Sequence, residues 1–249
     1  MKIRVINPNT SASMTAKIGA AARAVAAPGS TIEAVQPSFG AASIEGHHDD
    51  VWAAAGVTEQ VRAGEAEGAH AYVIACFGDP GLHAARELAH GPVVGVAEAA
   101  FHAATLVATG FSVVTTLART CVIAEHLVMQ YGFERRCRGI HATALAVLDL
   151  EDPGSGAFER ILRSAQDALR ADRSGAIVLG CAGMADLCRA LQKQLGVPVI
   201  DGVGAAVKLA EGLVALGLGT SKRGDYAWPL AKPYTGLAAP FTPHEHGVR

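Results

Sequence analysis

Short apolar runs alternate along this chain with longer stretches in which alanine and charged residues recur at helical spacing. The runs are continuously hydrophobic, which is typical of strands covered on both faces in a parallel sheet. The sequence therefore predicts an α/β protein with mainly parallel sheets. Strands are expected at residues 3–7, 31–36, 71–76, 92–96, 111–117, 143–150, 176–181 and 198–202. Helices are expected at residues 11–26, 50–67, 82–90, 158–170 and 205–216, and a loose tail is expected from Tyr226.

Two segments of the chain resemble each other. "YVIACFGDPG" ends an apolar run on Cys76, and "IVLGCAGM" ends another on Cys181. In each segment a glycine and a helical pattern come after the cysteine. A second strand then begins with Pro-Val, at Pro92 in the first segment and at Pro198 in the second. Chance similarity between alanine-rich segments is the alternative. We interpret the pattern as an internal repeat, which predicts two pseudo-symmetric lobes, each a mainly parallel sheet flanked by helices, with one cysteine from each lobe at a shared cleft.

Thiols at strand ends suit proton transfer. Ligands of parallel sheets bind beyond the carboxyl ends of strands, and the amides of a following helix are expected to lower the pKa of each thiol. Neither cysteine motif carries a neighbouring histidine base, which disfavours a nucleophilic role. Cys76 and Cys181 on opposite faces of a planar carbanion would remove a proton from one side and return one to the other. The alternative is that both thiols only pack in the core.

Glycines beside the two cysteines leave backbone N–H groups free to approach a ligand. Gly78, Gly180 and Gly183 are therefore candidates to stabilise negative charge on a substrate oxygen. The other three cysteines lack this context and are interpreted as packing residues. They are Cys121, Cys137 and Cys188.

Composition narrows the class of partner. The 249 residues carry a net charge of −2 and are half apolar, with a mean hydropathy of +0.26. The basic clusters that nucleic acids and anionic membranes require are missing from the sequence. It also contains neither a signal peptide pattern nor an apolar run of membrane-spanning length, and its odd number of cysteines is typical of reduced thiols. We expect a soluble, cytoplasmic protein with a small-molecule substrate.

Several motifs together resemble the hydantoin/allantoin racemases of the aspartate/glutamate racemase superfamily. These are "VINPNTS", "SIEGHHDD", "ACFGDPGL", "SVVTTLART", "GCAGMADL" and "VPVIDGV". The resemblance implies cofactor-independent, two-base inversion at C5 of a hydantoin ring, with Cys76 and Cys181 as acid and base. It also implies a homo-oligomer whose first lobe, with Cys76, combines residues 1–96 and 205–249, and whose second, with Cys181, covers 97–204. "GDPG" resembles the allantoin-type members more, but the choice of substrate stays open.

Further pocket residues are predicted with an alternative for most of them. Asn9 is either a substrate donor or a helix cap. Thr115 and Thr116 either bond ring carbonyls or cap the next helix, and Phe39 either walls the pocket or covers the core. The family resemblance adds Ser43, Gly183 and Met184 as pocket residues.

Other functions remain to be weighed. "EGHHDD" has the composition of a metal site, but adjacent residues rarely converge on one ion, so no metal is expected. An amino-acid racemase or related isomerase of the same fold is the first alternative. No arginine near either cysteine motif is evident to hold a carboxylate, which favours the cyclic amide. A non-catalytic small-molecule binding protein is the second alternative, and it leaves the matched cysteines unexplained.

Overall fold

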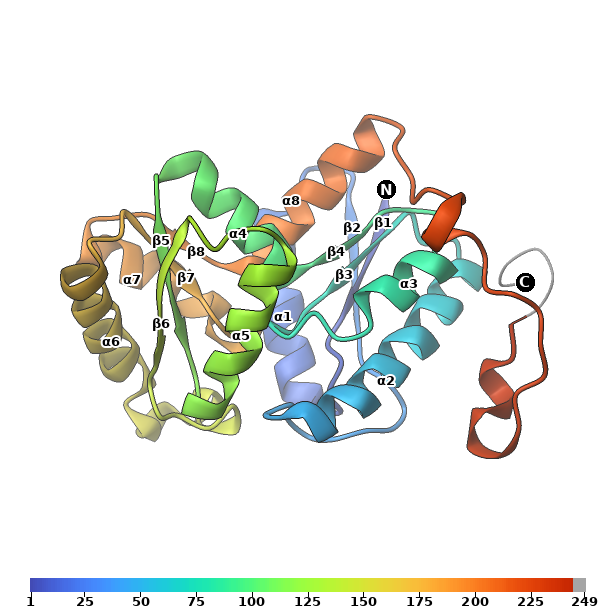
Figure 1. Cartoon of the computed structure of the whole chain (residues 1–249), viewed down its shortest axis with the longest axis horizontal. Helices are drawn as coiled ribbons and strands as arrows, with labels where there is room; N and C mark the ends of the chain where they lie inside the picture. Colours follow the sequence, from blue (N-terminus) through green and yellow to red (C-terminus); the bar gives the residue numbers. More distant parts are fainter. Residues whose placement is uncertain (244–249) are drawn as a thin grey trace.

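Two four-stranded parallel sheets form the framework of the computed structural model, which describes residues 1–243 (Figure 1). The first sheet has the order β2-β1-β3-β4 and the second the order β6-β5-β7-β8. The strands are β1 (Lys2–Ile6), β2 (Thr31–Val35), β3 (Ala71–Ile74), β4 (Val93–Gly95), β5 (Phe111–Thr115), β6 (Cys137–Ala142), β7 (Ala176–Leu179) and β8 (Val199–Ile200).

The two sheets repeat the same strand order when each is counted from its own first strand. β3 and β7 are the third strands of their sheets, and Cys76 and Cys181 each follow their strand by two residues. This equivalence confirms the predicted fold class of two pseudo-symmetric lobes with helix-flanked parallel sheets. The boundaries proposed for the lobes stay a prediction, and residues 244–249 of the first lobe lie outside the described residues.

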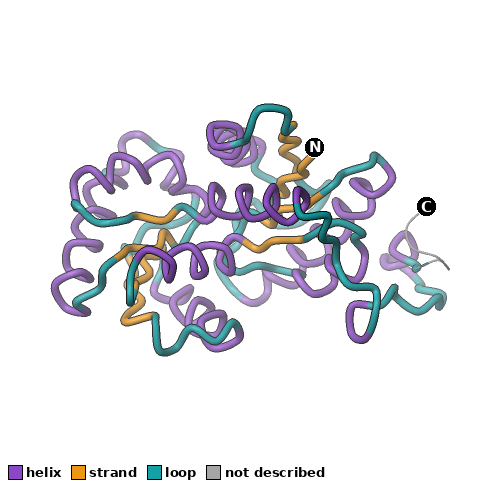
Figure 2. The backbone as a smooth tube through the Cα atoms, turned by 90° about the horizontal axis from the view of Figure 1, so that it is seen from above, coloured by secondary structure: helices purple, strands orange, loops and turns teal. Residues whose placement is uncertain are grey.

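Helices surround both sheets (Figure 2). α8 contacts α1 and β3 of the first lobe and also α4, so the chain returns to the first sheet after completing the second. The helices are α1 (Ala12–Val25), α2 (His47–Ala66), α3 (Leu82–Leu88), α4 (Val96–Val107), α5 (Ala118–Gln130), α6 (Ala157–Asp172), α7 (Cys188–Leu195) and α8 (Gly202–Ala215).

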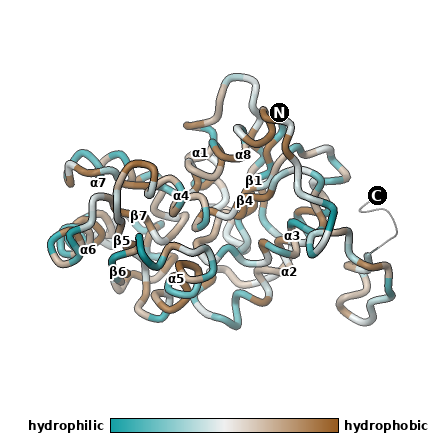
Figure 3. Tube along the Cα trace, turned by 45° about the horizontal axis from the view of Figure 1, so that its top comes forward, coloured by the Kyte–Doolittle hydropathy of each residue, from teal (hydrophilic) through white to brown (hydrophobic). Residues whose placement is uncertain are grey.

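Hydrophobic residues are frequent in the inner strands, whereas hydrophilic and hydrophobic residues alternate along the outer helix α6 (Figure 3). One cluster of buried side chains contains Ile3 and Val73 of the first sheet together with Val207 of α8. The same cluster contains Val147 and Ala182, which come from loops beside the second sheet. The core of the first sheet therefore includes side chains from the segments that follow β6 and β7, which packs the two cysteine-bearing strand ends close together.

The predicted strand at 143–150 is wrong. The sixth strand is β6, a half-buried edge strand that precedes this segment, and residues 148–151 form a short 3₁₀ helix. The apolar side chains of this segment are buried without pairing in a sheet. Leu145 and Leu150 pack on the second sheet, and Val147 packs in the cluster of the first sheet. An edge strand needs little hydrophobicity because one side of it faces solvent, so "CRGIHA" carries no strong strand pattern.

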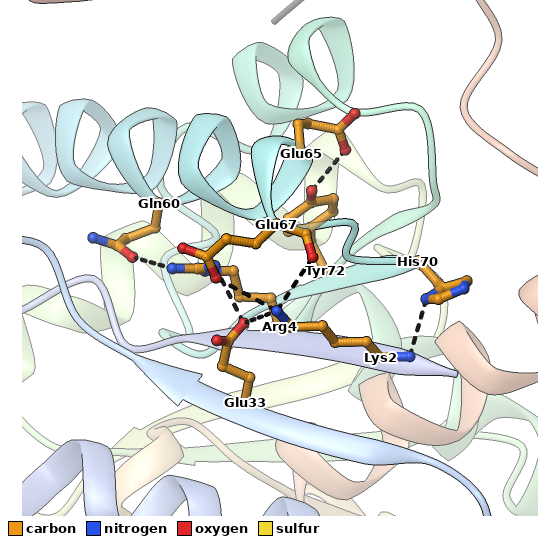
Figure 4. Close-up of polar contacts among 8 residues, drawn as sticks. All are labelled: Lys2, Arg4, Glu33, Gln60, Glu65, Glu67, His70 and Tyr72. Carbon is orange, nitrogen blue, oxygen red and sulfur yellow. Dashed lines mark hydrogen bonds and ion pairs between the residues drawn. The ribbon is translucent and has the colours of Figure 1, made fainter. Parts of the chain in front are cut away.

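A buried arginine fastens α2 to the first sheet (Figure 4). Arg4 of β1 is 5% exposed and forms ion pairs with Glu33 at 3.2 Å and Glu67 at 2.7 Å. Gln60 of α2 accepts a further hydrogen bond from its guanidinium. Close by, the hydroxyl of Tyr72 donates to Glu65 at 2.6 Å. These contacts fix the end of α2 over β1 and β3, and they thereby fix the direction from which its first turn approaches the cleft.

The C-terminal segment is more closely attached than the loose tail that the sequence predicts. The Tyr226 hydroxyl lies 2.7 Å from Nδ1 of His83 in α3. Arg62 of α2 donates to the carbonyls of Phe241 and Thr242. Proline and glycine prevent regular helix or strand here, but side-chain contacts with α2 and α3 still order the path up to residue 243.

Within residues 1–243, no helix combines the length and the apolar character that crossing a membrane requires.

Candidate active site

A small cavity lies where the two lobes meet, beyond the carboxyl ends of β1, β3, β5 and β7. Its volume is about 60 Å³, and Cys76 and Cys181 both line it. The structure therefore brings the two repeat cysteines to one cavity, one from each sheet. Switch points at the carboxyl ends of parallel strands are the usual ligand sites of such sheets.

Burial controls the protonation of both thiols. It raises the pKa of Cys76 to about 12 and that of Cys181 to about 11. Cys76 is further affected by the nearby charges of Cys181, Asp50 and Asp79, all of which disfavour its thiolate. Lys17 acts in the opposite direction on Cys181. Both cysteines are therefore mainly thiols at neutral pH, and each is a strong base once ionised.

The expected lowering of the thiol pKa by helix N-termini is wrong, for a geometric reason. α3 begins only at Leu82, six residues after Cys76, and a 3₁₀ helix rather than an α-helix follows Cys181. What favours the thiolates is local. The backbone amides of Gly78 and Gly183, each two residues after its cysteine, hydrogen-bond the sulfur atoms and lower their pKa, but less than burial raises it.

Asp79 fixes the turn that carries Cys76. It has a left-handed backbone conformation with φ of 44°, and its amide donates to the Cys76 carbonyl at 2.9 Å. Its carboxylate accepts from the amides of Ala97 and Glu98, where it caps α4, and from the Tyr131 hydroxyl at 2.9 Å. Burial raises the pKa of Asp79 to about 7. The Cys76 turn is thereby tied to α4 and to the end of α5.

Hydrogen bonds narrow the choices left open for three predicted residues, all of which line the cavity. Asn9 is not the helix cap, because Ser11 caps α1. The Asn9 Oδ1 atom accepts from the Ser11 amide, and its Nδ2 has no hydrogen-bond partner within residues 1–243, which leaves that donor for a ligand. The Thr115 hydroxyl donates to the Gly180 carbonyl at 3.1 Å and supports the Cys181 turn. Thr116 lies beside it.

The other predicted pocket residues divide into two groups. Gly78 and Gly183 line the cavity. Phe39 does not, because its ring packs edge-to-face on Phe241 with centroids 6.1 Å apart. Met184 is fully buried in the second lobe's core. Ser43 does not line the cavity, although the next residue, Ile44, does.

Sequence reasoning missed several cavity residues. Ile44, Ile123 and Val147 form apolar walls, and Asp50 contributes a carboxyl group from the first turns of α2. Asp50 belongs to the "EGHHDD" segment, which drew attention only as a metal motif. Among the described residues, no group of three or more His, Cys, Asp or Glu could hold a metal ion. The sequence signal for Asp50 is its position about one helical turn after Gly46, the residue before α2.

Comparison with known proteins shows the family to which a chain with this fold and cavity belongs. The sequence profile of the Asp/Glu/hydantoin racemases matches residues 3–210. The chain belongs to the Asp/Glu/hydantoin racemase family.

Relatives within this family match the chain over nearly its whole length. A hydantoin racemase of Pseudomonas sp. (strain NS671) is 48% identical over 97% of this chain and 97% of its own. The structure of an allantoin racemase from Klebsiella pneumoniae superposes with a TM-score of 0.96 at 59% identity, covering 98% of this chain and all of that one. The allantoin racemase from Pseudomonas fluorescens gives a TM-score of 0.91 at 43% identity, covering 95% of this chain and all of that one. The chain is thus an isomerase of the racemase type.

Proposed function

We propose that this racemase inverts C5 of 5-substituted hydantoins, allantoin among them, through Cys76 and Cys181 and without a cofactor. The single observation that carries the proposal is the meeting of these two thiols at one cavity, each from the equivalent strand of its sheet. The hydantoin and allantoin racemases among the relatives support the substrate class.

The proposed step balances with two sulfur atoms alone. The thiolate of one cysteine removes the C5 hydrogen as a proton, and the electron pair passes into the ring as an enolate. The thiol of the other cysteine donates its proton to the opposite face of C5. The product is the other enantiomer, the second cysteine is now the thiolate, and the enzyme is ready for the reverse substrate.

The other residues that line the cavity support this two-base mechanism. An enolate oxygen needs hydrogen-bond donors, and the free Nδ2 of Asn9 and the hydroxyl of Thr116 lie on the cavity wall. Ile44, Ile123 and Val147 exclude water from the reacting carbon. A strong thiolate base suits a weak carbon acid, because proton transfer is easier when the two pKa values are closer.

The lining argues against free amino acids as substrates. None of the described residues that line the cavity is Lys or Arg, and one is the acid Asp50. An α-carboxylate in this cavity would be desolvated without a cationic partner, which is costly. A neutral ring has no such cost, so the aspartate/glutamate type of substrate is disfavoured.

The proposal extends to the protein's setting. We place it in the cytoplasm as a homo-oligomer. Leu106 and Val107 at the end of α4 are 84% and 59% exposed. Contiguous apolar surface is a sign of subunit association, and these two neighbouring residues would form part of such a surface.

Single substitutions of the two cysteines test the mechanism. Cys76→Ser and Cys181→Ser should each reduce racemisation of a 5-substituted hydantoin by at least about a thousandfold, because a serine hydroxyl is a far weaker acid than a thiol and is almost never ionised near neutral pH. Polarimetry measures the loss, and NMR in D2O measures deuterium entering C5. Cys188→Ser, whose sulfur bonds the Val199 carbonyl away from the cavity, is the matched control and should retain activity. Near-normal racemisation by either active-site variant would contradict the two-base mechanism.

A further inference from the structure

Among the described residues that line the cavity, Asp50 is the one with a carboxyl group, and apart from the two cysteines the others are apolar or neutral. Its position is close to Cys76. A Cβ atom placed on Gly78 would lie 3.5 Å from Oδ1 of Asp50, 3.9 Å from the Cys76 sulfur and 3.9 Å from Cγ2 of Ile123. The carboxylate and the proposed acid/base sulfur therefore border the same small volume.

The carboxylate of Asp50 is not used in any hydrogen bond that the described residues make. Within residues 1–243 its oxygens accept no hydrogen bond, and its backbone amide makes the ordinary helical bond to Gly46. The neighbouring Asp49 performs the structural task, because its Oδ2 accepts from the Glu45 amide at 3.0 Å and closes the start of α2. Burial raises the pKa of Asp50, and His47 only partly offsets this effect.

An unpaired carboxylate in such a place is matched by a ligand that donates hydrogen bonds. A hydantoin with an alkyl group at C5 offers no donor on that substituent. Allantoin carries a ureido group at C5, with N–H and NH2 donors in a row. A carboxylate can accept two of these together, as it does from other planar donors.

Resting on the proposed function, we propose that Asp50 determines substrate specificity by accepting hydrogen bonds from a ureido group on C5 of the hydantoin ring. The apolar wall of Ile123 beside it limits the width of the substituent, and Cys76 lies on the same side of the cavity. The preferred substrates are hydantoins whose C5 substituent is a planar hydrogen-bond donor. Alkyl hydantoins of similar size bind without this contact.

The test compares two substrates and three variants. Racemisation of allantoin and of 5-isobutylhydantoin is measured for the unchanged chain and for Asp50→Val, Asp50→Asn and Asp49→Asn. In Asp50→Val the ratio of kcat/KM for allantoin to that for the alkyl hydantoin should fall about 10- to 100-fold, mainly through KM, as expected for a lost hydrogen bond to a charged group. Asp50→Asn keeps the shape and one acceptor, so its ratio should fall about half as far on a logarithmic scale. Asp49→Asn should leave the ratio unchanged.

The outcomes separate this inference from the proposed function. If the unchanged chain racemises neither substrate, the proposed function fails and this inference fails with it. If the chain is active but Asp50→Val and Asp50→Asn keep the original ratio, or lose both substrates equally, only the role of Asp50 is overturned. Circular dichroism of each variant checks folding, and Asp50→Asn decides the matter if the valine variant is unfolded.

Discussion

Two opposing effects act on the thiols of Cys76 and Cys181. Each sulfur is desolvated, which disfavours its charge, and each receives a hydrogen bond from the glycine amide two residues later, which favours it. Desolvation is the larger effect. The resting pair therefore holds few thiolates, but each thiolate that forms is more basic than a free one.

Activity should consequently rise with pH. Because the pKa values of the thiols lie at about 11 and about 12, the fraction with one thiolate and one thiol grows about tenfold per pH unit through the neutral range. We expect kcat/KM for a 5-alkyl hydantoin to follow this slope from about pH 6.5 to pH 8.5. Initial rates by polarimetry measure it. A flat profile over that range would show that a thiolate is already formed at neutral pH.

The residue scale also shows what a sequence pattern can and cannot reveal. The repeat of apolar run, cysteine and glycine was enough to single out Cys76 and Cys181. Asn9 and Thr115 were also placed at strand ends, and they line the cavity. Phe39 and Met184 do not line the cavity, and an aromatic or a methionine near a motif looks alike in the sequence whether it packs inward or borders a ligand. Their positions depend on residues far away in the chain: the Phe39 ring packs on Phe241, and Met184 packs in the core of the second sheet.

At the scale of elements, the side chain of Asp79 connects the loop after β3 to α4 and to the end of α5. The carboxylate of Asp79, between β3 and α3, caps α4 and binds Tyr131 after α5. Gly95, the residue at the N-cap position of α4, has no side chain of its own, and a Cβ there would lie 2.3 Å from the Asp79 carboxyl carbon. The cap must therefore come from outside the helix.

The buried carboxyl of Asp79 should make stability depend on pH. Its pKa is raised from 3.8 to about 7, so the folded state holds a proton that the unfolded state releases. Its contribution is most favourable below about pH 4 and is lost as pH rises to about 7, by on the order of 4 kcal/mol. Asp79→Asn, which does not ionise, lacks this slope.

Urea unfolding of the unchanged chain and of Asp79→Asn at about pH 5 and about pH 8 measures this effect. The difference in free energy of unfolding between the two proteins should shift in favour of the variant as pH rises. The same shift in Asp49→Asn, or none in Asp79→Asn, would contradict the role given to Asp79.

Most elements follow from periodicity because their hydrophobic pattern and their burial agree. β1, β3, β5 and β7 are central strands, and their predicted bounds are correct to within two residues. The sequence pattern did not predict β6, because an edge strand is only half buried. Residues 143–150 were predicted as a strand instead, but they are apolar because their side chains cover the cavity and the core. Hydrophobicity alone does not distinguish a segment that covers the core from a strand that pairs in a sheet.

For the whole molecule, hydrogen bonds join the two lobes beside the cavity. Glu45 from the loop before α2 accepts a hydrogen bond from the Val147 amide of the second lobe at 2.9 Å. Lys17 of α1 donates to the Leu150 carbonyl at 3.0 Å. The neighbours Ile44 and Val147 both line the cavity, so these bonds hold the walls of the cavity together.

Removing the contact between the lobes should weaken substrate binding. In Glu45→Met the Val147 amide loses its acceptor, and we expect KM to rise about 5- to 10-fold with a smaller change in kcat. Glu45→Gln keeps an acceptor of the same length and should stay within about twofold of the unchanged chain. Steady-state kinetics on both variants measure the difference. Equal KM values for the two variants would show that the hydrogen bond is unimportant.

The matching strand orders of the two sheets have a kinetic consequence. Mirror-image substrates are equally stable, so at equilibrium they are equally abundant and the enzyme must have the same kcat/KM in both directions. This equality holds for any racemase, and the duplicated strands supply the two directions with equivalent sulfur atoms. Asp50 has no counterpart lining the opposite side of the cavity among the described residues. Any enantiomer that it holds more tightly must therefore also turn over more slowly, in the same proportion.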